Sequence, residues 1–440
     1  MQIQRLTAIN FRCFEQLTLD LKPGFNLLIG DNGAGKTAVL DALMLGLGSY
    51  FLGFRIQQQP APSITSFDAR RIVREVGGTV DMQAQYPVLI GCDGLSEGAQ
   101  LEWLRARQGE GNKTTIRDAR QLSDFGAEQL KRLRTRDQPS DLPLFGYYGT
   151  ERLWVHLGEP RAPMKLAQSR AAGYRYCLAR ESNIRYIAEW LKQRTLSNVQ
   201  EQAARADPKT GTVTITPDVH IRTISQAVCS CIPGARELYY SVKHKGLFLR
   251  FFDQRELPFY LLSDGVRGTL QLVADLAWRA VALNPHLGAA APSRSTGVVL
   301  IDELDLALHP SWQVRIINDL VRVFPRLQFV ATTHSPLILA GAKGAHVLRL
   351  EGGRAYPQEH VYGQDSNTVL TDVMDGPARP PEMVRELDHI AALVDAGQVQ
   401  QARWEITRLE QVLGPQSPDL VRLRTALEFL HPPRDKDRGA

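Results

Sequence analysis

The segment Gly30–Thr37 constrains the fold more than any other stretch of this 440-residue chain. It reads Gly-Asp-Asn-Gly-Ala-Gly-Lys-Thr and matches the pattern G-x-x-x-x-G-K-[ST] in full. The apolar run Phe25–Ile29 precedes it, and an apolar run of helical character, Ala38–Leu47, follows it. A strand, a glycine-rich turn and a helix in this order form a phosphate-binding loop, so the sequence predicts an α/β fold with a nucleotide site.

The residue types in this loop suit phosphate binding. Glycines let backbone N–H groups turn toward phosphates without a Cβ clash, and the N-terminus of the following helix adds a positive dipole end. We expect Lys36 to contact the β and γ phosphates and the Thr37 hydroxyl to bind Mg²⁺. The predicted nucleotide-contacting residues are Asn32, Gly33, Ala34, Gly35, Lys36 and Thr37.

Two acids, Asp302 and Glu303, end a second apolar strand, Val298–Ile301. Carboxylates at the carboxyl end of a parallel strand face the ligand crevice of an α/β sheet. We expect Asp302 to bind Mg²⁺, directly or through water, and Glu303 to polarise the attacking water. A third apolar strand, Leu327–Ala331, precedes His334, which we expect to reach the γ-phosphate or that water.

Length and composition indicate a globular protein of more than one lobe. The chain exceeds the usual size of one compact core, and its 43% hydrophobic and 22% charged residues are ordinary. No apolar run reaches the roughly 18 residues of a membrane span, and the N-terminus has no apolar signal core. The five cysteines are odd in number and scattered, which favours a reducing compartment. We therefore expect a cytoplasmic protein.

Hydrophobic periodicity predicts the remaining elements. Alternation over 3–21 indicates a half-exposed hairpin, and further strands are predicted at 86–91 and 143–148. Helices are predicted at 165–205, at the start of 217–255 before two strands, at 269–283, and as a packed C-terminal group at 381–396, 398–413 and 418–430. The predicted parts of the chain are 1–160 with an insertion at 51–140, 161–255, 256–368 and 369–440.

Further motifs resemble a known superfamily. LSDGVR at 262–267 resembles the Leu-Ser-x-Gly signature loop of ABC-type ATPases and lies about forty residues before Asp302. DELDLALHP at 302–310 and TTHSP at 332–336 resemble the D-loop and switch-histidine segments of the RecF/SMC/OLD branch of these ATPases. NFRCF at 10–14 resembles the Asn-Phe-Arg-x-Phe strand of the same branch.

This resemblance implies an ABC-type ATPase head, with a P-loop sheet, an antiparallel β lobe, helical insertions and a C-terminal helical region. It implies that ATP and Mg²⁺ are bound and that Arg12 is directed toward the nucleotide. It also implies a homodimer or a higher even oligomer in which two chains face each other head to tail. Each ATP is then enclosed between the P-loop of one chain and Ser263 and Gly265 of the other.

A closer resemblance is to the bacterial ATPase group that includes the PtuA subunit of Septu and retron anti-phage systems. It is carried by PLFGYYGTERLW at 143–154, by LSDGVRGTLQLVADLAWR at 262–279 and by VYGQDSNTVLTDVM at 361–374. It runs over most of the chain, with gaps at 51–140 and 195–235. It places Gly149–Arg152 in the Q-loop region, although this chain has no Gln there. Tyr147 and Tyr148 are equally explained as buried strand aromatics.

The sequence leaves three functions open. The first is a defence ATPase that dimerises on ATP and controls an effector through its C-terminal helices. That effector is expected to be a nuclease, because residues 335–430, before the terminal tail, contain no Asp-x-Asp pair for cleavage by this chain. The second is a RecF-like DNA repair ATPase without a toxic effector. The third, a transporter subunit, is disfavoured by the long insertions and the terminal helices.

DNA contact rests on two groups of basic residues. Lys131–Arg136 is the densest basic run, and further arginines follow at regular spacing, namely Arg170, Arg175, Arg180 and Arg185. These residues could form a solvated face or contact phosphates of DNA in a closed dimer.

Overall fold

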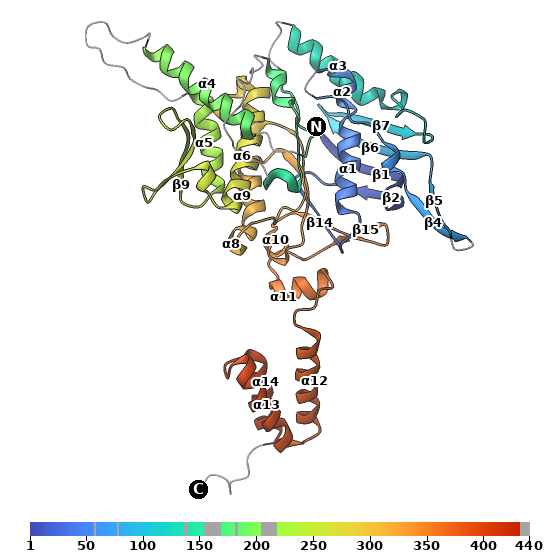
Figure 1. Ribbon diagram of the computed structural model, residues 1–440, viewed down its shortest axis with the longest axis vertical. Helices are drawn as coiled ribbons and strands as arrows, with labels where there is room; N and C mark the ends of the chain where they lie inside the picture. Colours follow the sequence, from blue (N-terminus) through green and yellow to red (C-terminus); the bar gives the residue numbers. More distant parts are fainter. Residues whose placement is uncertain are drawn as a thin grey trace. The chain divides into compact units, whose positions relative to one another are not determined.

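The protein is described by a computed structural model that covers residues 1–56, 59–76, 79–135, 140–153, 169–180, 184–203 and 218–431. The chain forms two compact units, Met1–Val369 and Leu370–Ala440 (Figure 1). The second unit begins one residue after the start of the predicted C-terminal region at 369. The finer predicted division of the first unit stays a prediction.

A six-stranded sheet forms the centre of the first unit, in the order β15-β14-β3-β13-β12-β8. Neighbouring strands from β14 to β8 are parallel, and β15 pairs antiparallel with β14. The strands are β3 (Phe25–Ile29), β8 (Leu144–Tyr148), β12 (Gly297–Ile301), β13 (Leu327–Thr332), β14 (His346–Glu351) and β15 (Arg354–Gln358). Every residue of β3, β8, β12 and β13 is buried, which confirms the predicted buried strands. Parallel direction places the segments that follow these four strands along one edge of the sheet.

An antiparallel sheet accompanies the central sheet, in the order β2-β1-β6-β7. Its strands are β1 (Gln2–Phe11), β2 (Phe14–Asp20), β6 (Val88–Ser96) and β7 (Ala99–Arg107). Helix α1 (Lys36–Leu47) contacts β1, β6 and β7 of this sheet and β12 and β13 of the central sheet. The helix therefore joins the two sheets. The indole of Trp103 donates to the carbonyl of Gly46 at 2.9 Å, which ties β7 to the end of α1.

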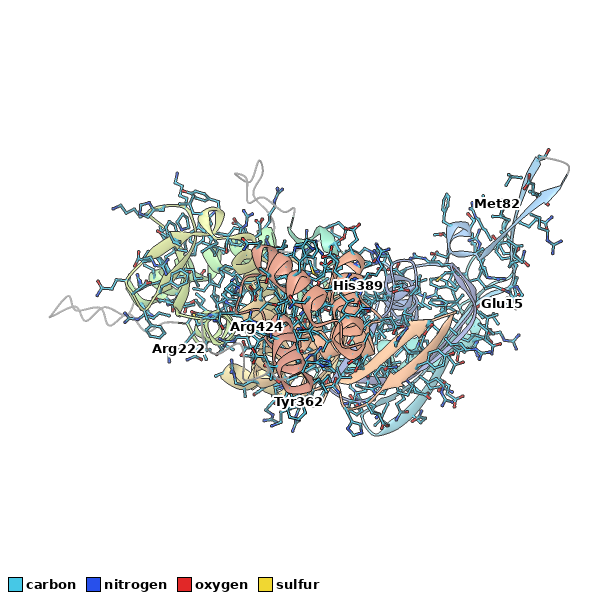
Figure 2. All side chains as sticks on the ribbon, turned by 90° about the horizontal axis from the view of Figure 1, so that it is seen from below. Glu15, Met82, Arg222, Tyr362, His389 and Arg424 are labelled. Carbon is cyan, nitrogen blue, oxygen red and sulfur yellow. The ribbon has the colours of Figure 1, made fainter. Side chains whose placement is uncertain are left out.

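Besides β6 and β7, the described part of the insertion contributes two helices and a ribbon. Helices α2 (Tyr50–Gly53) and α3 (Arg120–Arg134) pack together, and β4 (Arg71–Val76) pairs with β5 (Thr79–Ala84). Several apolar side chains of this ribbon are exposed, among them Met82, which is labelled in Figure 2.

Helix α6 (Asp264–Leu283) contacts α4 (Ile184–Ala203), α5 (Val219–Cys231) and β8. It begins five residues before the predicted start at 269. Strands β9 (Ala235–Ser241), β10 (Gly246–Phe251) and β11 (Glu256–Pro258) form a small antiparallel sheet, and β9 contacts α5. Helix α9 (Ile316–Val323) also contacts α5.

The predicted helix at 165–205 is wrong for residues 169–180. Within the described residues of this range, only Ile184–Ala203 is α-helical, whereas 170–174 form a 3₁₀ turn. The reason is that the edge of β8 needs hydrogen-bond partners. The N–H of Tyr147 donates to the carbonyl of Cys177 at 2.8 Å, and the N–H of Gly149 donates to that of Arg180 at 3.2 Å. Backbone carbonyls used in this way are not available to a helix.

In the described part of the second unit, three α-helices pack together: α12 (Pro381–Asp395), α13 (Val399–Leu413) and α14 (Pro418–Leu430). Their ends lie within one residue of the predicted bounds. All three contact one another around buried side chains that include Ile390, Ile406 and Leu420. Gly397 and Gly414 follow α12 and α13 with φ of 71° and 81°, the conformation that favours glycine at helix ends. The sequence also predicts a disordered tail at 431–440, and residues 432–440 of it lie outside the described residues.

No helix in the described part of the chain combines the length and apolar content that crossing a membrane requires.

Candidate nucleotide site

The predicted loop follows β3 and opens α1. Gly30 and Gly35 have φ of 142° and 96°, and a Cβ on Gly35 would lie 2.4 Å from the ring of Phe14. Both positions therefore require glycine. The ammonium of Lys36 donates to the carbonyls of Gly30 at 2.7 Å and Asp31 at 2.9 Å, so it lies over the loop. Burial lowers the pKa of Lys36, and the nearby carboxylates, Asp302 first among them, act in the opposite direction.

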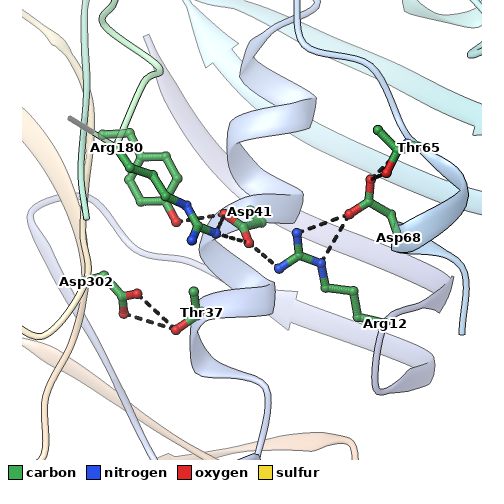
Figure 3. A network of polar contacts seen from close by, with 8 residues as sticks. Arg12, Thr37, Asp41, Thr65, Asp68, Arg180 and Asp302 are labelled. Carbon is green, nitrogen blue, oxygen red and sulfur yellow. Dashed lines mark hydrogen bonds and ion pairs between the residues drawn. The ribbon is translucent and has the colours of Figure 1, made fainter. Parts of the chain in front are cut away.

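Thr37 and Asp302, the two residues predicted to bind Mg²⁺, lie next to each other in the structure. The Thr37 hydroxyl donates to Oδ2 of Asp302 at 2.9 Å (Figure 3). The Thr332 hydroxyl donates to Oδ1 of Asp302 at 2.7 Å. Among the described residues, no group of three or more His, Cys, Asp or Glu side chains could hold a metal. A hydroxyl and one carboxylate fit Mg²⁺ bound to a nucleotide, because Mg²⁺ takes few protein ligands and completes its shell with phosphates and water.

Glu303 and His334 lie at the ends of the adjacent strands β12 and β13. Glu303 is half-buried and His334 is exposed. The Glu303 N–H donates to the Thr332 hydroxyl at 2.7 Å. Asp305 accepts from the Thr333 hydroxyl at 2.6 Å and from the N–H of His334 at 3.2 Å, so it fixes the segment that carries the histidine. No pattern in the sequence indicated this role of Asp305.

Asp41 is the centre of a polar network that the sequence analysis missed. Its side chain is 1% exposed and pairs with the guanidinium groups of Arg12 and Arg180 (Figure 3). The Tyr147 hydroxyl donates to Asp41 at 2.7 Å, and Arg12 also donates to Asp68 at 3.1 and 3.2 Å. We call these five residues the Asp41 network. Asp41 lies four residues after Thr37, one helical turn further along the same face of α1, and this spacing was the available signal.

Arg12 was expected to point toward the nucleotide. In the structure the Arg12 side chain is 35% exposed, and its guanidinium is held by Asp41 and Asp68. A direct contact between Arg12 and a nucleotide stays a prediction.

The segment Gly149–Arg152 follows β8 and therefore shares the edge with the loop and the acid pair. Tyr147 and Tyr148 are buried, as expected of strand aromatics, and their hydroxyls donate to Asp41 and Asp275. The guanidinium of Arg152 is buried against the backbone of the acid pair.

Ser263 and Gly265 form the start of α6. Ser263 is exposed at the N-cap, and its side chain makes no capping hydrogen bond. A Cβ on Gly265 would lie 2.5 Å from the carbonyl oxygen of Ala307, so this turn packs against the segment 304–310 of its own chain. Among the described residues, neither Ser263 nor Gly265 hydrogen-bonds to the phosphate-binding loop of the same chain.

Several of the basic residues considered for DNA have partners within the chain. Arg132 pairs with Glu97 and Glu128. Arg170 donates to the carbonyls of Leu283 and Ser140 at 2.7 and 2.6 Å. Arg175 lies over the rings of Tyr176 and Tyr186, and Arg180 belongs to the Asp41 network. Arg136 lies outside the described residues. These contacts favour a structural role for Arg132, Arg170, Arg175 and Arg180.

Two family models match the chain. Residues 149–340 match the family described as "AAA domain, putative AbiEii toxin, Type IV TA system", and residues 5–202 match a second AAA domain family. The two matches together contain the loop, the signature-like turn, the acid pair and His334.

Individual proteins are also similar to the chain. The "Retron Ec83 probable ATPase" of Escherichia coli is 25% identical over 95% of this chain and 85% of that relative. The "Septu protein PtuA" of Bacillus mycoides (strain KBAB4) is 56% identical over 24% of this chain, a match that spans 15% of the relative. A solved structure of an Smc head bound to the C-winged helix domain of ScpA is 14% identical over 81% of this chain and 96% of the solved chain, with a TM-score of 0.46.

Proposed function

Because the chain is an ABC-type ATPase of the RecF/SMC/OLD branch, we propose that two copies bind head to tail and enclose ATP between them. The start of α6 carries this proposal. Ser263 is exposed, lacks a capping partner and makes no hydrogen bond to the loop of its own chain. A hydroxyl and backbone N–H groups at the start of a long helix can bind a phosphate of the ATP that the loop of the other chain holds.

Within each site, Lys36 and the loop amides bind the phosphates, and Thr37 and Asp302 hold Mg²⁺. Glu303 polarises the attacking water, and His334 contacts the γ-phosphate or that water. The geometry supports these roles because all of these residues lie along one sheet edge, on β3, β12 and β13 or directly after them. When bound, Mg²⁺ neutralises charge that develops on the phosphates.

The dimer is tested with Glu303→Gln, which should bind ATP, hydrolyse it slowly and accumulate the closed state. With ATP and Mg²⁺, light scattering should give twice the mass of one chain. Without nucleotide, a smaller fraction of the protein should have this doubled mass. Ser263→Arg, added to Glu303→Gln, should keep ATP binding and lose the doubled mass.

The matched control is Ser293→Arg, because Ser293 is also exposed but lies on the short helix α7 (Ala291–Arg294). It should leave the doubled mass unchanged. Loss of ATP affinity in Ser263→Arg, or a doubled mass that persists in it, would show that Ser263 does not act across the interface. Near-normal turnover by Glu303→Gln would move the catalytic base elsewhere.

We propose further that ATP binding and turnover regulate an effector protein, a nuclease, in bacterial anti-phage defence. The names of the relatives support this setting, because they place similar chains in retron and Septu systems. The second unit is the proposed binding surface for the effector. Its apolar residues Trp404, Val412 and Phe429 are 63%, 67% and 84% exposed, although its core is filled. A cytoplasmic location is part of the proposal, and all five cysteines are free thiols, as a reducing compartment would keep them.

The effector is tested by co-purification with the protein encoded next to this chain and by protection of cells against phage. Trp404→Glu and Phe429→Glu should abolish both, while Gln16→Glu, an exposed polar position on β2 of the first unit, should leave both unchanged. Wild-type co-purification and protection by both variants would contradict the assigned surface. A chain that purifies alone, gives no protection and shows salt-dependent stimulation of its ATPase by DNA would instead support the RecF-like function.

A further inference from the structure

Arg152 lies directly behind the acid pair. Its side chain donates from Nη1 to the carbonyl of Asp302 at 2.6 Å and from Nη2 to the carbonyl of Glu303 at 2.5 Å. Nη1 also donates to the carbonyl of Gly149 at 3.0 Å. One guanidinium therefore binds two successive carbonyls at the end of β12 and anchors them to the segment after β8.

The backbone that Arg152 holds has an unusual conformation. Glu303 has a φ of 49°, in the left-handed region that residues other than glycine seldom occupy. Its N–H donates to the Thr332 hydroxyl of β13, and its carbonyl accepts from Arg152. The carbonyl also accepts from the N–H of Leu306 at 3.0 Å, so side chains from two neighbouring elements and a local turn together hold both polar groups of the Glu303 backbone. Such contacts maintain a strained conformation and set the direction in which the Glu303 side chain leaves the strand.

The arginine is specific to this task. Its residue is 5% exposed, and burial lowers the pKa of Arg152 to about 10 while the carboxylates of Asp302, Glu303 and Asp305 act in the opposite direction. The group therefore stays charged at neutral pH. A planar guanidinium can donate to two carbonyls at once from a fixed fork, whereas a lysine ammonium is a single point on a flexible chain.

We propose that Arg152 is a positioning residue for ATP hydrolysis, which holds the carboxylate of Glu303 in the orientation that the attacking water requires. Arg152 acts only through the backbone of the acid pair. The proposal rests on the role proposed above for Glu303, and it assigns to the segment 149–152 a function that does not depend on a glutamine.

The test compares Arg152→Gln and Arg152→Lys with Arg105→Gln in the full-length protein. Arg105 is a matched control because it is 2% exposed and donates to the carbonyls of Thr115 and Pro62, both at 3.2 Å. Burial also lowers the pKa of Arg105 to about 10. Its partners lie in the insertion, so it reports the general effect of removing a buried arginine. For each variant we would measure the thermal midpoint, the Kd for ATP and kcat.

Arg152→Gln should lower kcat at least about tenfold and leave the Kd for ATP within about threefold of wild type, because a misplaced base affects the chemical step more than binding. Arg152→Lys should lie between this variant and wild type, and it decides the question if Arg152→Gln does not fold. Arg105→Gln should have the kcat of wild type, however far the change lowers the thermal midpoint. Added to Glu303→Gln, the Arg152→Gln change should cause no further fall in kcat, because the residue works through Glu303.

Three outcomes would overturn the proposal: kcat within about twofold of wild type in Arg152→Gln, loss of ATP affinity as large as the loss of kcat, or an equal fall of kcat on the Glu303→Gln background. Near-normal turnover by Glu303→Gln alone would refute the proposed base, and the inference about Arg152 with it. Slow turnover by Glu303→Gln combined with normal turnover by Arg152→Gln would refute the inference alone.

Discussion

Replacement of Asp41 by asparagine should destabilise the first unit in a way that the Asp41 network allows us to estimate. Asparagine keeps the size of the side chain and removes its negative charge. The carboxylate is 1% exposed and accepts from Arg12, Arg180 and the hydroxyl of Tyr147. All three donors lose a charged acceptor, and the two arginines keep their charges.

The size of the effect follows from these contacts. Hydrogen bonds to a charged group contribute about 1 kcal/mol more than those between neutral groups. The buried Tyr147 contact should therefore lose about 1 kcal/mol. The two arginines are 35% and 38% exposed, so solvent screening should reduce the loss at each to about half of that value. The total is about 2 kcal/mol.

The assay is thermal unfolding of the nucleotide-free protein. The first unit spans 369 residues. With an unfolding entropy of about 2.1 cal/mol/K per residue, a loss of about 2 kcal/mol lowers the midpoint by roughly 2–3 °C. Asp20→Asn is the control, because Asp20 pairs with Arg5 on the surface, where the two side chains are 67% and 52% exposed. That change should shift the midpoint by less than about 1 °C, since exposed pairs contribute little.

Single arginine replacements test whether the stabilising free energy of the Asp41 network is divided among its donors. Arg12→Gln and Arg180→Gln each leave Asp41 with one arginine and Tyr147, so each should cost about half as much as Asp41→Asn or less. The reasoning is refuted if Asp41→Asn shifts the midpoint no more than Asp20→Asn, or if each arginine replacement costs as much as the loss of Asp41.

Three further predictions concern binding, coupling and the second unit. Lys36→Ala should abolish ATP binding measured by calorimetry, and tight binding by this variant would refute the loop assignment. Gly265→Ala should lower the ATPase rate about tenfold, because its Cβ would lie 2.5 Å from the Ala307 carbonyl oxygen. Gly111→Ala is the control, because a Cβ there meets nothing within 4 Å, and it should not lower the rate. Equal rates for the two variants would show that the close packing of Gly265 on Ala307 does not affect catalysis. Ile406→Ala should destabilise the second unit by about 3 kcal/mol, seen as faster hydrogen exchange in α12–α14 alone, because Ile406 is 4% exposed in that core; unchanged exchange would contradict the packing.

Much of the fold was predictable because its signals are local. The loop Gly30–Thr37 and the buried strands β3, β12 and β13 are continuous patterns in the chain, and the structure confirms these elements. The comparisons confirm the ATPase family to which these motifs belong. The roles of Glu303, His334 and Ser263 stay predictions, because they depend on a nucleotide and a second chain.

The structure predicted from the sequence was wrong or incomplete where a segment remote in the chain decides the local structure. Residues 169–180 have a composition that suits a helix, but the open edge of β8 uses their carbonyls. Asp41 reads as an ordinary helix residue until Arg12 and Arg180 meet it from positions 29 residues before and 139 residues after it in the chain.

The sequence by itself determined which chemical groups the candidate site contains. The phosphate-binding loop is one continuous segment and the acid pair is another, and binding of phosphates and Mg²⁺ dictates the residue types in both. Only the tertiary structure decided how these groups are held. The strand order places the ends of β3, β13, β12 and β8 along one edge, and this brings Arg152 to the backbone of Glu303 across 151 positions of the chain. Hydrogen bonds between such distant residues depend on sheet order and burial, which no local pattern of residues encodes.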